Sequence, residues 1–169
     1  DLHSFPTRRS SDLEINHILD DELNAYLKSV RTKIGRKGLV YVVIDACHAG
    51  SSYRGEEEDS IIVRGTNSGF SASGKQFVPK VDKRGKIKVD KSASMADICI
   101  IEACRSYQFN SEIQEKGVYY GSLSFYVNKV LQEIILSHDK SWIDKVSRYM
   151  DSDVRLVRQN VVVETSLYL

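Results

Sequence analysis

The segment VYVVIDACHAGSS, residues 40 to 52, begins as an unbroken run of apolar and β-branched residues and then changes character. Asp45, Cys47 and His48 follow within a few positions, and small residues come next. Because the apolar run does not alternate with polar residues, it predicts a central β-strand over 39–45 that is covered on both faces. This strand leads directly into a carboxylate and a thiol, which marks its end as a candidate site.

The overall composition is that of an ordinary globular domain. The chain has 169 residues, of which 41% are hydrophobic and 28% are charged, and its formal net charge is +1. A chain of this length forms one domain and buries roughly two thirds of its unfolded surface. The small net charge does not favour nucleic acid or an anionic membrane as a partner. No apolar run approaches the roughly 20 residues of a membrane span.

The cysteine usage favours free thiols. Cys47, Cys99 and Cys104 are an odd number without the regular spacing of a disulfide framework, which indicates a reducing compartment, and we expect a cytoplasmic protein. There is no C-x₂-C pair, so we expect no metal site, and Cys99 and Cys104 are interpreted as structural residues.

The first thirteen residues differ from the rest of the chain. The stretch DLHSFPTRRSSDL is polar and aperiodic, and it resembles the translation of a common sequencing-library adapter. We therefore expect residues 1–13 to be non-native, as a tag or fusion scar is, and native sequence to begin near Glu14. A genuine disordered N-terminal arm is the alternative.

Helical spacing of apolar residues predicts three helices. Asp20 and Asp21 supply carboxylates at the start of the first, and Gly35 is its expected stop. Ser141 is a candidate N-cap for the third. The apolar positions of the three helices are Leu23, Tyr26, Leu27, Val30 and Ile34, then Leu123, Val127, Val130, Leu131 and Ile134, then Ile143, Val146, Tyr149 and Met150.

A second buried strand is expected over 97–103, where DICIIEA is again continuously apolar. Shorter strands are expected at 61–63, 76–78, 86–89, 154–157 and 161–164. Residues 51–95 are otherwise rich in Gly, Ser and charge, which is typical either of a functional loop or of a solvated surface insertion. The basic run KVDKRGKIKVDK is interleaved with acids and lacks aromatic residues, so we expect no nucleic-acid partner.

This alternation of elements predicts an α/β fold with a mainly parallel sheet. Ligands of such sheets bind at the carboxyl ends of the strands, where Cys47 and Cys104 are both expected. Residues i and i+2 of a strand face the same side, so Asp45 and Cys47 should leave this edge together. A buried structural cysteine is the alternative interpretation of Cys47.

Two motifs resemble those of the caspase-like cysteine peptidases, the clan of caspases, metacaspases and their bacterial relatives. DACHAG, residues 45–50, is similar to the D-[SA]-C-H-[SA]-G form of metacaspases and bacterial caspase-like proteins, and departs from the Q-A-C-[RQG]-G of animal caspases. IEACRSYQ, residues 101–108, with Glu112 following, is similar to the family's next strand and the loop that shapes its primary specificity pocket. The resemblance runs from about Glu14 to the C-terminus and implies a three-layer α-β-α fold.

The resemblance implies a cysteine-type endopeptidase acting on proteins or peptides. Cys47 would attack the peptide carbonyl to form an acyl-enzyme, and its backbone N–H would contribute to the oxyanion hole. Asp45 holds the family's acidic pocket position, and Glu112 aligns with a second acid that is usually Asp in metacaspases, which implies cleavage after Arg or Lys. Ser106 and Gln108 belong to the pocket loop. No cofactor is implied; some metacaspases are activated by calcium, but the sequence displays no calcium-binding loop.

The resemblance also implies a catalytic histidine about 50 residues before the cysteine. His17 lies much closer to Cys47 than that and lacks the Gly neighbours of the family motif, while His48 resembles a non-catalytic motif histidine. Counting back from Cys47 passes the start of the sequence. We therefore expect residues 14–169 to be a truncated catalytic domain without its first strands and general base, and the fragment itself can be inactive.

Two other interpretations stay open at this point. One is a non-catalytic caspase-like module used for binding or signalling. The other is an unrelated α/β protein with structural cysteines, in which the Cys47 thiol would be buried and unreactive.

Overall fold

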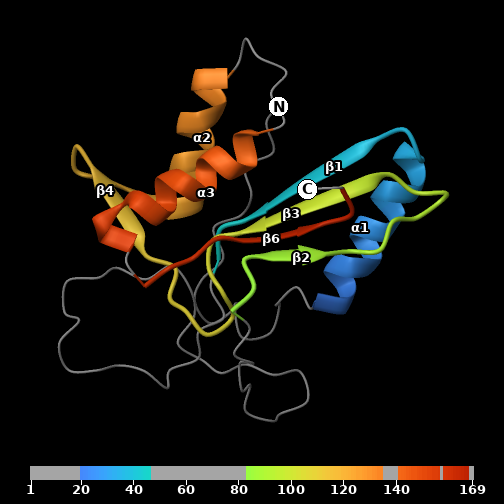
Figure 1. Ribbon diagram of the computed structural model, residues 1–169, viewed down its shortest axis with the longest axis horizontal. Helices are drawn as coiled ribbons and strands as arrows, with labels where there is room; N and C mark the ends of the chain where they lie inside the picture. Colours follow the sequence, from blue (N-terminus) through green and yellow to red (C-terminus); the bar gives the residue numbers. More distant parts are fainter. Residues whose placement is uncertain (1–19, 47–82, 135–140, 157, 168–169) are drawn as a thin grey trace, which may run out of the picture.

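A computed structural model of the chain describes residues 20–46, 83–134, 141–156 and 158–167. None of the helices in these ranges is both long enough and apolar enough to cross a lipid bilayer. The elements, shown in Figure 1, are α1 (Asp20–Ile34), β1 (Leu39–Ile44), β2 (Lys86–Lys88), β3 (Asp97–Glu102), β4 (Glu112–Glu115), β5 (Val118–Gly121), α2 (Ser122–Ile134), α3 (Trp142–Ser152), the 3-10 turn η2 (Val154–Leu156) and β6 (Val162–Thr165).

Four strands form a mixed sheet in the order β1-β3-β6-β2 (Figure 1). β1 is parallel to β3 and β2 is parallel to β6, whereas β3 and β6 are antiparallel. The predicted α/β class with a mainly parallel sheet is therefore confirmed. The register places Ile44 opposite Glu102, so the carboxyl ends of β1 and β3 lie side by side at the same end of the sheet.

The prediction that residues 39–45 form a central strand covered on both faces is wrong for the sheet that the structure describes. There β1 is an edge strand, and Tyr41 and Val43 on one of its faces are 40% and 42% exposed. The inner strands are β3 and β6, and β3 places Ile98, Cys99 and Ile101 in the core. An apolar, β-branched run indicates a strand that can pack on both sides, but its neighbours decide whether it does.

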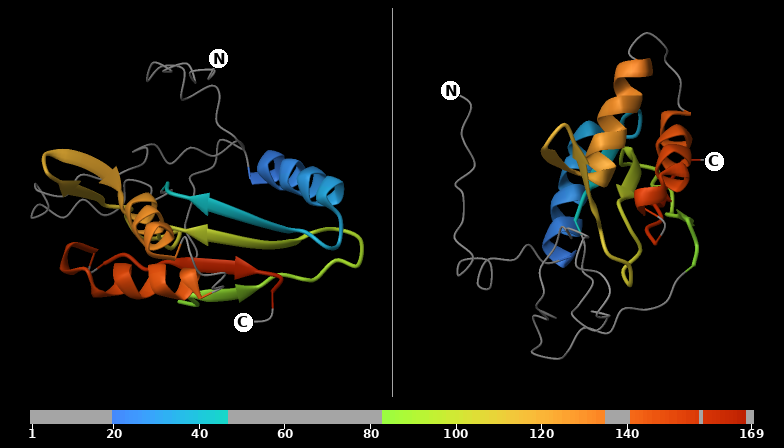
Figure 2. Two further views of the ribbon diagram at one scale, coloured as in Figure 1. Left: turned by 90° about the horizontal axis from the view of Figure 1, so that it is seen from above. Right: turned by 90° about the vertical axis from the view of Figure 1, so that its left-hand side faces the viewer.

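The helices lie on both sides of this sheet. Figure 2 shows α1 on one side and α3 on the other. The first turn of α3 contacts both outer strands: the Trp142 ring packs against Tyr41 of β1 at 5.2 Å between centroids, and Asp144 pairs with Lys86 of β2 at 2.9 Å. The core is built mainly from one strand and two helices, through Cys99 and Ile101 of β3, Leu123, Tyr126 and Val130 of α2, and Ile143, Val146 and Met150 of α3.

Helix α1 begins and ends close to the predicted positions. Gly35 adopts a positive φ of 77°, and its N–H donates to the Arg31 carbonyl at 3.0 Å, which is the expected αL termination of the helix. The predicted apolar stripe is only partly covered, however, because Tyr26 is 69% exposed and Ile34 is 49% exposed. Helical spacing alone could not show how much of this face the rest of the chain would cover.

Of the other predicted elements, some are confirmed and some are wrong. The helix over 123–134 and the strands near 86–89, 97–103 and 161–164 are confirmed as α2, β2, β3 and β6. The strand over 154–157 is wrong, since the described residues 154–156 form the 3-10 turn η2. Ser141 precedes α3 as predicted, but its backbone is helical and its side chain makes no capping hydrogen bond. The strands expected at 61–63 and 76–78 lie outside the described residues.

The hairpin of β4 and β5 was not expected from the sequence. Its loop is the pair Lys116 and Gly117, which have φ values of 51° and 81° and join Glu115 to its partner Val118. Two consecutive residues with positive φ match the hairpin turn that twists in the same sense as the strands it joins. A Gly in the second loop position was the available signal.

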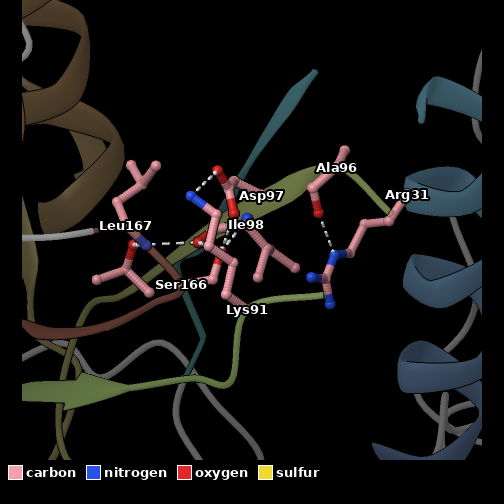
Figure 3. A network of polar contacts seen from close by, with 8 residues as sticks. Arg31, Lys91, Ala96, Asp97, Ile98, Ser166 and Leu167 are labelled. Carbon is pink, nitrogen blue, oxygen red and sulfur yellow. Dashed lines mark hydrogen bonds and ion pairs between the residues drawn. The ribbon is translucent and has the colours of Figure 1, made fainter. Parts of the chain in front are cut away.

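A polar cluster holds the amino end of β3, at the end of the sheet opposite Asp45 (Figure 3). The Arg31 Nε of α1 donates to the Ala96 carbonyl at 2.8 Å. The Ser166 hydroxyl donates to Asp97 Oδ1 at 3.0 Å and accepts from the Ile98 N–H at 2.9 Å. These hydrogen bonds thereby attach both helix α1 and the end of β6 to the amino end of β3.

Asp153 joins α2 to the end of α3. Its carboxylate accepts from the Tyr126 hydroxyl at 2.7 Å and from the Arg155 guanidinium at 2.7 Å. Burial acts to raise the pKa of this carboxyl, but the hydrogen bonds from Arg155 and Tyr126 outweigh it and lower the pKa from 3.8 to about 2. The charged form of Asp153 is therefore the one that the fold stabilises.

Truncating the core strand should destabilise the protein far more than truncating the edge strand. Ile101→Ala leaves a cavity at a fully buried position and should lower the free energy of unfolding by about 2–5 kcal/mol. Val43→Ala, at an exposed position of β1, should cost less than about 1 kcal/mol. Urea unfolding followed by circular dichroism measures both, and equal losses would contradict the placement of β3 in the core.

The Asp153 contacts should stabilise the fold in a pH-dependent way. Because the folded pKa of Asp153 is lowered, the stabilisation is complete above the unfolded value of 3.8 and is lost as pH falls toward 2. The difference in unfolding free energy between the wild type and Asp153→Asn should therefore be largest near neutral pH and shrink through this acidic range. A difference that does not change with pH would show that the charge of Asp153 contributes nothing.

Candidate functional site

The candidate site lies where β1 and β3 end side by side. The Ala103 N–H donates to the Ile44 carbonyl at 3.0 Å, which continues the pairing of the two strands to their last residues. Asp45 follows β1 directly, and Cys104 follows Ala103 after β3. Asp45, the first residue of the DACHAG motif, and the described IEACRSYQ motif thus lie at the same end of the sheet, where the carboxyl ends of β1 and β3 meet.

The carboxylate of Asp45 is held from two directions. Oδ1 accepts from the side-chain amide of Asn110 at 2.8 Å, and Oδ2 accepts from the backbone N–H of Ser124 at 2.9 Å. Ser124 lies in the first turn of α2, where backbone N–H groups are unpaired within the helix and the helix dipole favours negative charge. Both of these donors are neutral groups.

Beneath Asp45 lies a buried network of uncharged polar side chains centred on Gln159, which is 2% exposed. Gln159 Oε1 accepts from the Ser111 N–H at 2.9 Å. Gln159 Nε2 lies 2.9 Å from the Ala103 carbonyl, 2.9 Å from Asn110 Oδ1 and 2.6 Å from the Ser122 hydroxyl. One amide therefore joins the end of β3, the segment before β4 and the start of α2.

Gln108, a predicted pocket residue, shapes the loop after β3. Its Oε1 accepts from the N–H groups of Arg105 at 3.2 Å and Asn160 at 3.1 Å, and its Nε2 donates to Asn160 Oδ1 at 2.9 Å. Its backbone carbonyl accepts from the Cys104 thiol at 3.6 Å. These contacts fasten the loop to the segment that leads into β6.

The remaining predicted site residues divide into two groups. Ser106 is exposed in the turn of the loop after β3, and Glu112 is half-buried at the start of β4, opposite Gly121 and shortly after Asn110. Cys47 and His48 lie outside the described residues, as does His17, so the structure does not test the expected absence of a catalytic histidine.

The two other cysteines have structural roles, as the sequence analysis predicted. Cys99 is fully buried in β3, and burial raises the pKa of its thiol, although a hydrogen bond with Thr165 acts in the opposite direction. Cys104 is also buried. Over the four ranges with a described structure, no group of three or more His, Cys, Asp or Glu side chains is placed to hold a metal ion.

Four residues of this site were missed from the sequence. They are Asn110, Ser122, Ser124 and Gln159. Ser122 and Ser124 fall at a helix start, where small polar residues are common. Nothing in the local sequence pairs Asn110 with Gln159, because they meet only through the return of the chain into β6.

Family models, curated proteins and solved structures were all compared with this chain, and none of them matches it.

Removing the side-chain amide of Gln159 should lower the stability of the segments that it joins at the carboxyl end of β3. Gln159→Ala leaves the part-buried Ser111 N–H and the buried Ala103 carbonyl without this partner, and a buried polar group left unsatisfied costs about 1–3 kcal/mol. We expect the free energy of unfolding to fall by about 2–4 kcal/mol in urea titrations. Arg158→Ala, at the exposed neighbouring position, should change it by less than about 0.5 kcal/mol. Similar values for the two variants would contradict the role given to Gln159.

Proposed function

We propose that this chain is a caspase-like cysteine endopeptidase domain, with the three-layer α-β-α fold of that clan, which cleaves peptide bonds after Arg or Lys. The observation that carries the proposal is the position and anchoring of Asp45. It follows β1 at the end of the sheet where β3 leads into the IEACRSYQ motif, and it stands two positions before Cys47 in the sequence. An acid held in place two residues before the proposed nucleophile suits selection of a cationic side chain.

The electrostatics of Asp45 support this specificity. Among the residues that the structure describes, its hydrogen-bond donors are an amide and a backbone N–H, which orient the carboxylate without neutralising its charge. A carboxylate offers about four acceptor sites, so each oxygen keeps capacity for a further donor. A guanidinium or ammonium group of a substrate would supply that donor together with the compensating charge.

The proposed reaction begins with the Cys47 thiolate. It attacks the carbonyl carbon that follows the bound Arg or Lys, and the Cys47 backbone N–H donates to the developing oxyanion. Expulsion of the amine, which takes up a proton from a general acid, leaves a thioester with Cys47. Water then hydrolyses the thioester, releases the carboxylate product and restores the thiol. All four histidines of the chain lie outside the described residues, so no general base is assigned.

Fluorogenic peptides ending in Arg, Lys or Asp test the proposal. We expect hydrolysis after Arg and Lys but not after Asp, and a loss of at least about 1000-fold with Cys47→Ala. Cys99→Ala is the matched control, because it removes a buried thiol from within β3, outside the pocket loop, and should retain activity. Hydrolysis that persists in Cys47→Ala would overturn the assignment of the nucleophile.

A labelling experiment tests the site without requiring turnover. A peptidyl-arginine acyloxymethyl ketone should alkylate Cys47 of the native chain much faster than the matching aspartyl reagent, and Asp45→Ala should remove this difference. Cys99 and Cys104 should resist both reagents because they are buried. Mass spectrometry of tryptic peptides locates the label. Equal labelling of Cys47 by the two reagents would contradict cation selection, whereas selective binding of arginyl peptides without labelling or hydrolysis would favour the non-catalytic module.

A further inference from the structure

We infer that Asn110 is a positioning residue that holds the Asp45 carboxylate in the orientation for a two-pronged pair with a guanidinium, so that the site takes arginine in preference to lysine. The inference rests on the proposed function, and it adds a residue that the sequence motifs do not mark. Asn110 is fully buried and does not itself need to touch the substrate.

The orientation of the Gln159 amide is determined by its two backbone partners. Its Oε1 faces the Ser111 N–H and its Nε2 faces the Ala103 carbonyl. Exchanging the two ends would set a donor against an N–H and an acceptor against a carbonyl, which is unfavourable in a buried site. Gln159 therefore presents N–H to Asn110.

The orientation of the Gln159 amide determines the orientation of the Asn110 amide. Asn110 Oδ1 accepts from Gln159 Nε2 at 2.9 Å and from the Ser122 hydroxyl at 3.0 Å. The other end of the same amide, Nδ2, must then face Asp45, where it donates to Oδ1 at 2.8 Å. Two backbone groups thus determine, through two buried amides, which atom meets the carboxylate.

The result is a carboxylate with one protein donor on each oxygen. Asn110 holds Oδ1, and the Ser124 N–H at the start of α2 holds Oδ2. Rotation of the carboxylate would break at least one of these hydrogen bonds, so its plane is fixed before a ligand arrives. A fixed carboxylate favours guanidinium, which donates two parallel hydrogen bonds, over ammonium, which acts as a compact point charge.

Binding of small amides to the native chain tests this inference. The probes are Nα-acetyl-arginine amide, Nα-acetyl-lysine amide and the uncharged citrulline analogue, titrated against ¹⁵N-labelled protein and followed by NMR. We expect the arginine amide to bind about tenfold more tightly than the lysine amide, as one additional charge-assisted hydrogen bond allows, and the citrulline amide to bind most weakly.

Asn110→Ala should reduce the ratio of arginine to lysine affinity to about one to threefold. Gln159 Nε2 keeps the Ala103 carbonyl and the Ser122 hydroxyl as acceptors in this variant, so the hydrogen bonds lost are those of Asp45 and of the Ser122 hydroxyl, which donates to Asn110 Oδ1. Asn110→Asp serves as a second variant of nearly unchanged volume if Asn110→Ala does not fold. It retains the acceptor for Gln159 and Ser122, and at a pH where both carboxyls are ionised it sets an oxygen against Asp45, so it should also lose the preference there.

Ser166→Ala is the matched control, because it removes a buried hydroxyl that donates to a carboxylate, Asp97, at the opposite end of the sheet (Figure 3). It should lower stability but keep the wild-type ratio of affinities. A wild-type ratio in a folded Asn110 variant would overturn the positioning role while leaving the proposed function intact. If the wild-type chain does not distinguish the arginine amide from the citrulline amide, the cation site fails, and the positioning role fails with it.

Discussion

The buried amide of Gln159 connects segments that are far apart in the chain, and the geometry of the candidate site depends on it. One side chain satisfies a carbonyl at the end of β3 and an N–H just before β4, and it contacts the first residue of α2. Each of these groups would be unsatisfied if the segments moved apart, and the cost of unpaired polar groups is highest where water is excluded. The network therefore rigidifies the strand edge more effectively than apolar contacts of the same size.

Asp45 stands at the exposed end of this network. Its carboxylate accepts hydrogen bonds from the start of α2 and from a neutral amide, and it forms no ion pair with its described neighbours. A different arrangement holds Asp153, where Arg155 supplies a full positive charge and lowers the pKa of the carboxyl to about 2. The contrast distinguishes an acid that is paired with a cation from one whose described donors are neutral.

Much of the fold could be predicted from local patterns. Apolar spacing and stop signals located α1, α2, β3 and β6 because these patterns act within a few residues of one another. Two predictions were wrong for the same reason. β1 was expected to be covered on both faces, and residues 154–157 were expected to form an extended strand. In both cases an apolar composition was correctly recognised, but the outcome depended on which other segments were available for pairing.

By itself the sequence determined that the chain is α/β, that two strands end in motifs resembling those of caspase-like peptidases, and that Asp45 and Cys47 are the residues to examine. Periodicity and short motifs are properties of neighbouring residues, so they survive without knowledge of the fold. Only the tertiary structure decided that Asn110 and Ser124 hold Asp45 and that Gln159 orients Asn110. Hydrogen bonds between such distant residues form only when the chain returns to the same edge of the sheet, and no local pattern encodes that return.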